Sequence, residues 1–136
     1  MSNFKLNIFT PNGIVTKDMG CESLSIPTTT GMINVLPGHT HIISEVSTGT
    51  LTAKGNTGEK HFVMTAGVVK VLGNTINVLS TTSEKKEDID VERAGAALAK
   101  AELALSGKDA LSNDDMIKFG RKAERAIARI STAKLK

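Results

Sequence analysis

The hydrophobic period of the sequence changes once, at the polar segment 82–87. Before this segment, short runs of alternating apolar and polar residues are separated by turns such as Pro11-Asn12-Gly13 and Gly73-Asn74. After it, apolar residues recur every three or four positions, which is the period of an amphipathic helix. A chain with one such change is expected to fold as two units, and we predict domains at residues 1–83 and 84–136.

Short strands account for the first unit. Phe4, Leu6 and Ile8 alternate with polar residues, and Leu24 and Ile26 alternate in the same way before a Thr-Thr-Thr-Gly corner. Many short runs separated by glycine turns predict an antiparallel β-sandwich or a flattened barrel. Because the chain has four Phe and neither Trp nor Tyr, its core must be built mainly from Ile, Val, Leu and Met.

Two helices account for the second unit. Their apolar faces are Val91, Ala94, Leu98, Ala101 and Leu105 on the first helix and Met116, Phe119, Ala123, Ala126, Ile130 and Ala133 on the second. Ser106-Gly107 predicts the end of the first helix, and Ser112 or Asn113 is expected to cap the second. Two such helices joined by a short loop form an antiparallel hairpin, which gives an α+β fold.

Alanine dominates the apolar faces of this hairpin. Alanine permits close helix contact but removes little apolar area from water, at ~0.8 kcal/mol per methyl-sized group. The sequence therefore leaves two interpretations open, a hairpin that rearranges and a hairpin that stays docked.

Charge is distributed unevenly along the hairpin. Residues 84–115 contain nine acidic and five basic residues, whereas residues 116–136 contain seven basic and one acidic residue. Arg121, Arg125 and Arg129 recur at four-residue intervals and are expected to share a helix face. This basic face indicates either an anionic partner or ordinary solvated charge.

Motifs of catalysis and metal binding are missing from the sequence. There is no G-x-S-x-G, H-E-x-x-H or paired-cysteine motif, and the segment GNTGEKH lacks the ending of a phosphate loop. His39 and His41 supply two ligands at most and are interpreted as structural. Cys21 is a single cysteine, which excludes an internal disulfide and fits a reducing compartment. We therefore expect a protein that is not an enzyme and holds no metal.

Targeting and membrane signals are also missing. The opening MSNFKLNIF is not a signal peptide, and no run of 18 apolar residues occurs. Any membrane role is expected to depend on a partner. The net charge of +3 and the scarcity of aromatic residues argue against nucleic acid as that partner.

Three stretches of the chain match one family in order. Residues 6–13 read LNIFTPNG, residues 31–39 read GMINVLPGH against the pattern G-E-L-G-I-L-P-G-H, and residues 66–79 follow G-G-x-x-x-V-x-P-x-N-V-T-V-L. Together with the order of sandwich, acidic linker and helix hairpin, these stretches resemble the ε-subunit family of bacterial F-type ATP synthases.

The resemblance implies a non-catalytic rotor subunit that couples proton-driven rotation to ATP synthesis. In the family, a sandwich of about ten strands contacts the γ subunit and the membrane c-ring, at the cytoplasmic face of the bacterial inner membrane. The helix hairpin folds onto the sandwich or extends along γ, where its basic residues meet an acidic loop of the catalytic β subunit and inhibit ATP hydrolysis. The partner contacts implied for this chain are Met32, His39, Arg121, Lys122, Arg125 and Arg129.

A regulatory ATP site is also implied, although no cofactor is required. Residues 89–94 (IDVERA) match the family's I/L-D-x-x-R-A nucleotide motif, and residues 125–131 resemble its arginine-bearing partner segment. The implied ligand residues are Glu84, Asp90, Arg93, Arg125 and Arg129. Guanidinium groups suit phosphate oxygens, and carboxylates accept from ribose or adenine donors. The alternative is that Asp90 only caps a helix and Arg93 only pairs with a neighbouring acid.

Some positions depart from the family pattern. Met32 stands where the family usually has Glu, which removes a carboxylate from the expected c-ring contact. Asn34 replaces a glycine, His41 a proline and Ala66 the first residue of a Gly-Gly pair. Two rival functions remain open, a free-standing ATP sensor whose hairpin closes over the nucleotide and a nucleic-acid-binding module that uses the basic helix.

Overall fold

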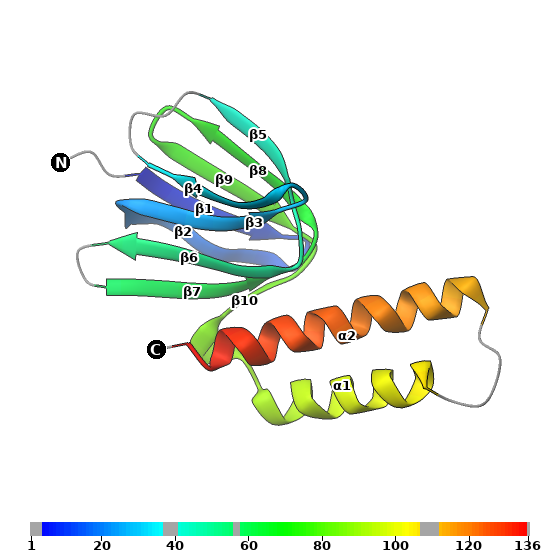
Figure 1. Ribbon diagram of the computed structural model, residues 1–136. Helices are drawn as coiled ribbons and strands as arrows, with labels where there is room; N and C mark the ends of the chain where they lie inside the picture. The colour runs from blue at the N-terminus through cyan, green and yellow to red at the C-terminus, as the bar shows by residue number, and fades with distance from the viewer. Residues whose placement is uncertain (1–3, 37–40, 56–57, 107–111, 136) are drawn as a thin grey trace.

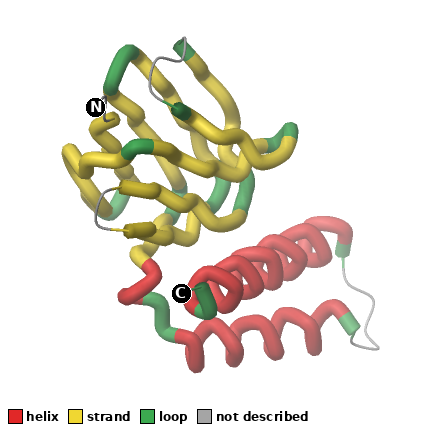
Figure 2. Tube along the Cα trace, turned by 60° about the vertical axis from the view of Figure 1, so that its left-hand side comes forward, coloured by secondary structure: helices red, strands yellow, loops and turns green. Residues whose placement is uncertain are grey.

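A computed structural model describes residues 4–36, 41–55, 58–106 and 112–135. Within these residues ten strands precede two helices (Figures 1 and 2), which confirms the predicted α+β fold. The strands are β1 (Phe4–Thr10), β2 (Gly13–Cys21), β3 (Ser23–Thr28), β4 (Gly31–Val35), β5 (Ile42–Val46), β6 (Gly49–Gly55), β7 (Gly58–Met64), β8 (Gly67–Leu72), β9 (Thr75–Ser80) and β10 (Ser83–Lys85).

The strands form one continuous sheet that folds over on itself into the sandwich. Their order is β10-β7-β6-β3-β5-β8-β9-β1-β2, and β4 pairs with β3. Among the described residues, β1 and β9 run parallel and the other paired strands run antiparallel. This pair departs from the purely antiparallel expectation, because two strands far apart in the chain need no tight turn between them.

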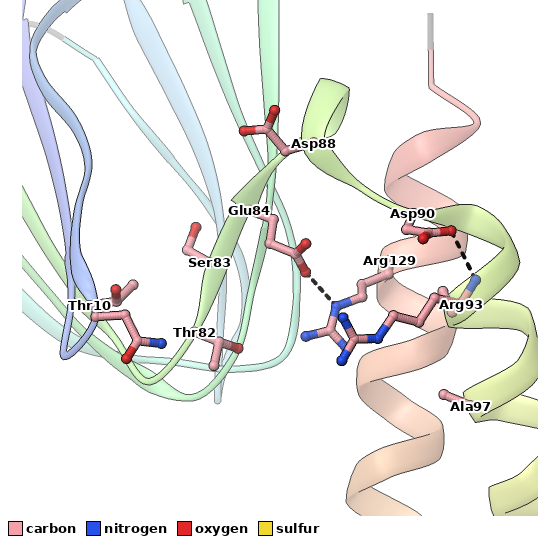
Figure 3. Close-up of a pocket in the computed structure, with 11 residues that line it drawn as sticks. Thr10, Thr82, Ser83, Glu84, Asp88, Asp90, Arg93, Ala97 and Arg129 are labelled. Atoms are coloured by element: carbon pink, nitrogen blue, oxygen red, sulfur yellow. Dashed lines mark hydrogen bonds and ion pairs between the residues drawn. The ribbon is translucent and has the colours of Figure 1, made fainter.

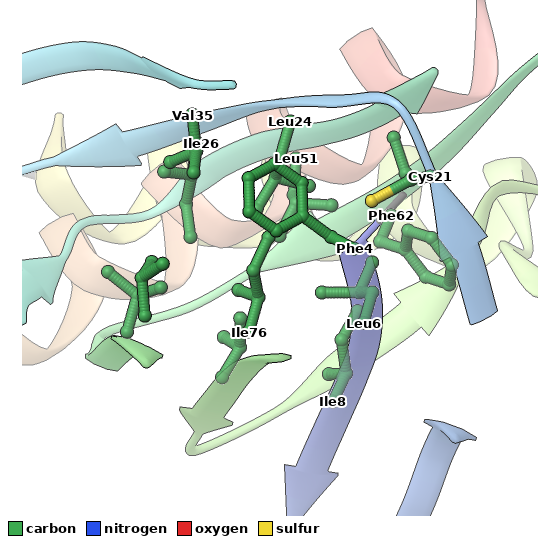
Figure 4. Packing of buried hydrophobic residues seen from close by; sticks show 14 of the residues in the cluster. Phe4, Leu6, Ile8, Cys21, Leu24, Ile26, Val35, Leu51, Phe62 and Ile76 are labelled. Atoms are coloured by element: carbon green, nitrogen blue, oxygen red, sulfur yellow. The ribbon is translucent and has the colours of Figure 1, made fainter. Parts of the chain in front are cut away.

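The core is aliphatic, as the composition requires. Phe4, Leu6 and Ile8 of β1 are completely buried, and they pack among residues from the other strands (Figure 4). These other residues include Leu24, Ile26, Val35, Leu51, Phe62 and Ile76. The alternation of apolar and polar residues along β1 therefore sets which side of the sheet faces inward.

Gly67 marks a very close approach of two strands. It is the first residue of β8, which pairs with β9. A Cβ atom built on Gly67 would collide with the carbonyl group of Leu79 and would lie 2.8 Å from the Cα atom of Ser80. No other residue type fits at this position without a shift of the backbone.

The segment 82–87, interpreted from the sequence as a linker, is part of the sheet. Residues 83–85 form β10 and pair with β7, and a 3₁₀ turn, η1 (Lys86–Asp88), follows. Thr65 and Thr82 join the two strands, since the Thr82 amide donates to Thr65 Oγ1 at 2.8 Å and the Thr65 amide donates to the Thr82 carbonyl at 3.2 Å. The interpretation of residues 82–87 as a linker is therefore wrong, because residues 83–85 form a strand and residues 86 and 87 begin the 3₁₀ turn. It failed because polar composition does not reveal strand pairing with a distant segment.

The C-terminal hairpin consists of α1 (Val91–Leu105) and α2 (Asn113–Ala133). Side chains cap both N-termini, with Asp90 accepting from the Arg93 amide and Ser112 from the Asp115 amide. The predicted apolar faces meet inside the hairpin, where Ala94, Ala101 and Ala126 are buried. At the ends, Val91, Leu105 and Met116 are exposed. No helix within the described residues is long and apolar enough to cross a membrane.

Candidate functional site

The hairpin docks through α2 on the outer face of β6 and β7. Figures 1 and 2 show α2 between the sandwich and α1. Val63 of β7 lies between the core residues Phe62 and Met64, so its side chain points outward, yet it is 3% exposed. Residues of α2 account for this burial, because Thr132 and Ala128 are themselves buried and α2 contacts both strands.

Polar contacts fix the docked helix. Thr50 Oγ1 on β6 lies 2.6 Å from Thr132 Oγ1, and the Thr132 hydroxyl also donates to the Ala128 carbonyl at 2.7 Å. Arg129 Nε donates to Glu84 Oε1 at 2.6 Å, which forms an ion pair between α2 and β10. Both ion-pair side chains are about one-third exposed, so water screens this contact and weakens it.

A cleft of about 510 Å³ opens beside this ion pair, between the sandwich and the hairpin (Figure 3). Its volume lies within the range typical of small-molecule sites. The sandwich side and the 3₁₀ turn contribute Thr10, Asn12, Thr82, Ser83, Glu84 and Asp88. The hairpin side contributes Asp90, Arg93, Ala94, Ala97 and Arg129. The cleft thus combines two guanidinium groups, three carboxylates and several neutral polar groups.

Residues predicted to bind nucleotide meet in this cleft with one exception. Glu84, Asp90, Arg93 and Arg129 all line it. Arg125 lies instead in an adjoining hollow of about 300 Å³ between the helices, although Arg129 and Ala97 line both spaces. One Asp90 carboxylate oxygen caps α1 at 3.0 Å from the Arg93 amide, so the capping role weighed for Asp90 is present in the structure.

The residues predicted to contact partners are dispersed. Met32 on β4 is 59% exposed, and His39 lies outside the described residues. Arg121 is exposed on α2, where it lines a hollow of about 480 Å³ with Arg125 and Lys118. Lys122 is exposed and places Nζ 5.5 Å from the centre of the Phe119 ring. The basic residues therefore wind around α2 and do not form a single straight stripe.

The sandwich itself supplies an apolar surface that the sequence reasoning missed. Four residues that point outward from β5, β8 and β9 are exposed, and we call them the apolar sandwich face: Ile43, Val68, Leu72 and Leu79. Val68 and Leu79 are cross-strand partners, and both line a groove of about 390 Å³. The sequence pattern could have revealed this surface. These apolar residues occupy alternate strand positions that point away from the core, where polar residues are usual.

Thr10 and Asn12 of the cleft were also missed as site residues. Thr10 ends β1 and Asn12 lies in the turn before β2, about 80 residues before Arg93 and about 120 before Arg129. The Pro11-Asn12-Gly13 sequence predicted this turn correctly, but its proximity to the hairpin depends on tertiary docking.

Other reactive groups lie away from the cleft. Cys21 is 1% exposed, and burial raises the pKa of its thiol. The thiol therefore stays protonated at neutral pH and is a poor nucleophile. Within the described residues no group of three or more His, Cys, Asp or Glu side chains is arranged to hold a metal ion.

Comparisons with known proteins agree along the whole chain. Residues 3–86 match the family model "ATP synthase, Delta/Epsilon chain, beta-sandwich domain", and residues 87–134 match "ATP synthase, Delta/Epsilon chain, long alpha-helix domain". This chain is 35% identical over 136 residues to ATP synthase epsilon chains of Staphylococcus aureus strains JH9 and Newman. Each alignment covers 100% of this chain and 100% of the relative.

Solved structures share the fold at lower sequence identity. A chain of the Euglena gracilis mitochondrial ATP synthase matches with a TM-score of 0.80 and 19% identity, over 94% of this chain and 79% of that one. A chain of the Tetrahymena thermophila mitochondrial ATP synthase central stalk and c-ring matches with a TM-score of 0.61 and 11% identity, over 98% and 100%. From the two family models and the full-length relatives it follows that this chain belongs to the ATP synthase delta/epsilon family.

Proposed function

We propose that this chain is a non-catalytic central-stalk subunit of an F-type ATP synthase, which turns with the rotor and regulates ATP hydrolysis. The observation that carries the regulatory part is the nature of the docked interface. An ion pair and a pair of threonine hydroxyls attach α2 to the sandwich. An interface with so few strong contacts suits a hairpin that leaves the sandwich and returns.

The sandwich is the part that docks on the γ subunit and the c-ring. Its apolar sandwich face supports this assignment, because the Ile43 side chain is 71% and the Leu79 side chain 57% exposed. Exposed apolar side chains that gather on one face of a protein often mark an interaction site. The membrane association of the chain would then come through these partners, at the cytoplasmic face of a bacterial inner membrane.

The hairpin is the part that inhibits hydrolysis, through its basic residues. Arg121, Lys122 and Lys118 are exposed, and none of them has an ion-pair partner among the described residues. Unpaired cations on one helix are available to an acidic loop of the catalytic β subunit when the hairpin extends. The boundary predicted between residues 83 and 84 divides β10, so in this scheme the docking unit is the sandwich through Lys85 and the regulatory unit is the hairpin of α1 and α2.

Loss of the hairpin should leave partner binding intact. A chain that ends after Asp88 keeps β10 and its pairing with β7, so we expect a folded sandwich that still binds γ. Circular dichroism and co-purification with γ from a bacterial membrane extract measure both properties. A folded but non-binding product would contradict the assignment of γ docking to the sandwich.

Two substitutions to Asp provide a matched control for this prediction. Leu79→Asp places a charge in the apolar sandwich face and should abolish co-purification with γ. Leu103→Asp changes a side chain on α1 that is 73% exposed and should leave co-purification unchanged. Retained γ binding by Leu79→Asp would remove this face from the docking surface. If the unmodified chain does not bind γ, the free-standing ATP sensor and the nucleic-acid module become the better functions.

The cleft between sandwich and hairpin is the proposed site for regulatory ATP. Arg93 and Arg129 supply planar donors for phosphate oxygens, and carboxylates of the cleft accept from ribose hydroxyls. A nucleotide held between the two units would favour the docked hairpin. To change the ratio of docked to extended hairpin from 1:99 to 99:1, ATP must bind the docked form about 10⁴-fold more tightly than the extended form. Cellular ATP therefore works as a switch when the two forms are nearly equal in free energy.

Substitution of Arg93 should abolish the response to ATP. Arg93→Ala removes a guanidinium group that would donate hydrogen bonds to phosphate, whereas Arg93→Lys should restore part of the response because it supplies charge without the planar fork. Amide chemical shifts of the isolated chain in millimolar ATP provide the measurement, at residues 84–94 and 121–130. Arg121→Ala is the control, because Arg121 does not line the cleft. Unperturbed amides in both segments would mean that the arginines serve partner contacts alone.

A further inference from the structure

A chemically reactive pair of residues lies at the turn between β1 and β2. Asn12 is followed directly by Gly13, and no other Asn-Gly pair occurs in the sequence. A backbone nitrogen can attack the side-chain amide of the asparagine that precedes it and close a five-membered ring. A side chain on the attacking residue hinders this approach, and glycine has none. The sequence therefore singles out Asn12 among the asparagines of the chain.

The structure leaves the Asn12 side chain free to react. Asn12 and Gly13 are both exposed, and the Asn12 carboxamide makes no hydrogen bond with the described residues. A Cβ atom built on Gly13 would meet nothing within 4 Å, so open space lies beside the attacking residue. The φ angle of Gly13 is 137°, which residues with a side chain rarely adopt. Nothing in the described fold therefore blocks rotation of the carboxamide toward the Gly13 nitrogen.

The other described asparagines lack one or both of these properties, because each is followed by a residue that carries a side chain. Asn7 donates from Nδ2 to Asn77 Oδ1 at 2.9 Å, and its own Oδ1 accepts from the Asp18 amide at 2.7 Å. These contacts hold both carboxamides in place. Asn74 is exposed in the turn between β8 and β9, but the β-branched Thr75 follows it and crowds the attacking nitrogen.

We propose that Asn12 is a site of spontaneous deamidation. The Gly13 nitrogen loses its proton and forms a bond to Asn12 Cγ, and the Cγ–Nδ2 bond breaks as the amide nitrogen takes up a proton and leaves as ammonia. Water then opens the succinimide ring at either carbonyl, which leaves aspartate or isoaspartate at position 12. The reaction consumes only water, so it is independent of the proposed function.

The modification changes the charge of the cleft between the sandwich and the hairpin. Asn12 lines this cleft together with two guanidinium groups and three carboxylates. The carboxyl group formed at position 12 is ionised at neutral pH and adds a fourth carboxylate. Deamidation therefore makes the cleft more acidic as the molecule ages.

Incubation of the full chain at neutral and at mildly alkaline pH tests this site. Peptide mapping by mass spectrometry should find deamidation at Asn12 at least about tenfold faster than at Asn74, because glycine leaves the attacking nitrogen uncrowded and threonine does not. The rate should rise with pH, since the attacking nitrogen must lose its proton. Isoaspartate, detected with protein isoaspartyl methyltransferase, should form together with aspartate because water opens the ring at either carbonyl.

Asn12→Gln is the matched variant. It keeps an exposed carboxamide, but its longer side chain must close a six-membered ring, so the modification at position 12 should disappear. Circular dichroism before and after incubation shows that the chain stays folded. Equal rates at Asn12 and Asn74 in the folded chain would overturn the proposal. A reaction at Asn12 that yields aspartate alone, or that occurs only after denaturation in urea, would overturn it as well.

Discussion

Replacement of Gly67 by Ala should destabilise the sandwich by about 3 kcal/mol or more. The added methyl group would collide with the Leu79 carbonyl and would lie 2.9 Å from its carbon atom. These atoms belong to the backbone of β9, which β1 and β8 hold on both sides, so relief requires distortion of the central sheet. Overpacking of this kind costs typically 1–3 kcal/mol and sometimes more, against a total stability of about 5–15 kcal/mol. Urea unfolding followed by circular dichroism gives the difference in free energy.

Gly95→Ala is the matched control and should change stability in the opposite direction. Gly95 lies in α1, and a Cβ atom built on it meets no atom within 4 Å. Alanine exceeds glycine in helix propensity by about 0.8–1.0 kcal/mol, so this variant should gain up to that amount if the docked hairpin and the sandwich unfold together. A Gly67→Ala chain as stable as the unmodified chain would contradict the close approach of β8 and β9.

Removal of the basic side chains from α2 should accelerate ATP hydrolysis by the assembled enzyme. Replacement of Arg121, Lys122, Arg125 and Arg129 by Ala removes four cations and keeps helix propensity high. Without them the extended hairpin loses its attraction to an acidic loop, and we expect at least about a fivefold increase in rate, the lower end of typical regulatory coupling. Steady-state hydrolysis by reconstituted enzyme measures the rate, and proton pumping shows whether rotation remains coupled.

Arg129 has a second role that affects how the quadruple variant is interpreted. Its ion pair with Glu84 holds the docked form, so its removal also favours the extended hairpin. The triple variant that retains Arg129 separates these effects, and it should hydrolyse ATP nearly as fast as the quadruple variant. Glu84→Gln weakens the docked form without removing a cation and should slow hydrolysis. An unchanged rate in the triple variant, under conditions where deletion of the hairpin raises it, would exclude the charge mechanism.

The architecture was predictable because it depends on local periodicity. Alternation at Phe4, Leu6 and Ile8 marked a buried strand, and recurrence of Ala94, Leu98 and Ala101 marked a helix face. Each pattern reports the side on which a residue lies, and burial in the structure follows that side. The strand β10 was not predictable in this way. Its three residues are polar, and their structure comes from pairing with β7 and from the threonine contacts between residues 65 and 82.

Apart from Glu84, which the family resemblance implied, the residues of the candidate site were predictable only on the hairpin side. The four-residue spacing of the arginines suggested one shared face, but each step of four residues turns a side chain by about 40°. Over two steps this rotation carries Arg129 into the cleft and leaves Arg121 in a separate hollow. The sandwich wall depends on how the two units dock, and no local pattern in the sequence encodes that arrangement.

The short connection between the 3₁₀ turn after β10 and α1 restricts how the hairpin can move relative to the sandwich. The sheet and the 3₁₀ turn hold the chain as far as Asp88, and Ile89 and Asp90 alone precede α1. Two extended residues span about 7 Å, whereas the 21 residues of α2 run for about 32 Å. Because the connection is so short, the hairpin cannot slide along the sandwich. If the hairpin leaves the sandwich, it must rotate about residues 89 and 90, at the edge formed by β10. A small rotation at Ile89 would therefore displace the loop end of the hairpin by a much larger distance. Glu84 would remain on the sheet, where it pairs with Arg129 again when the hairpin docks.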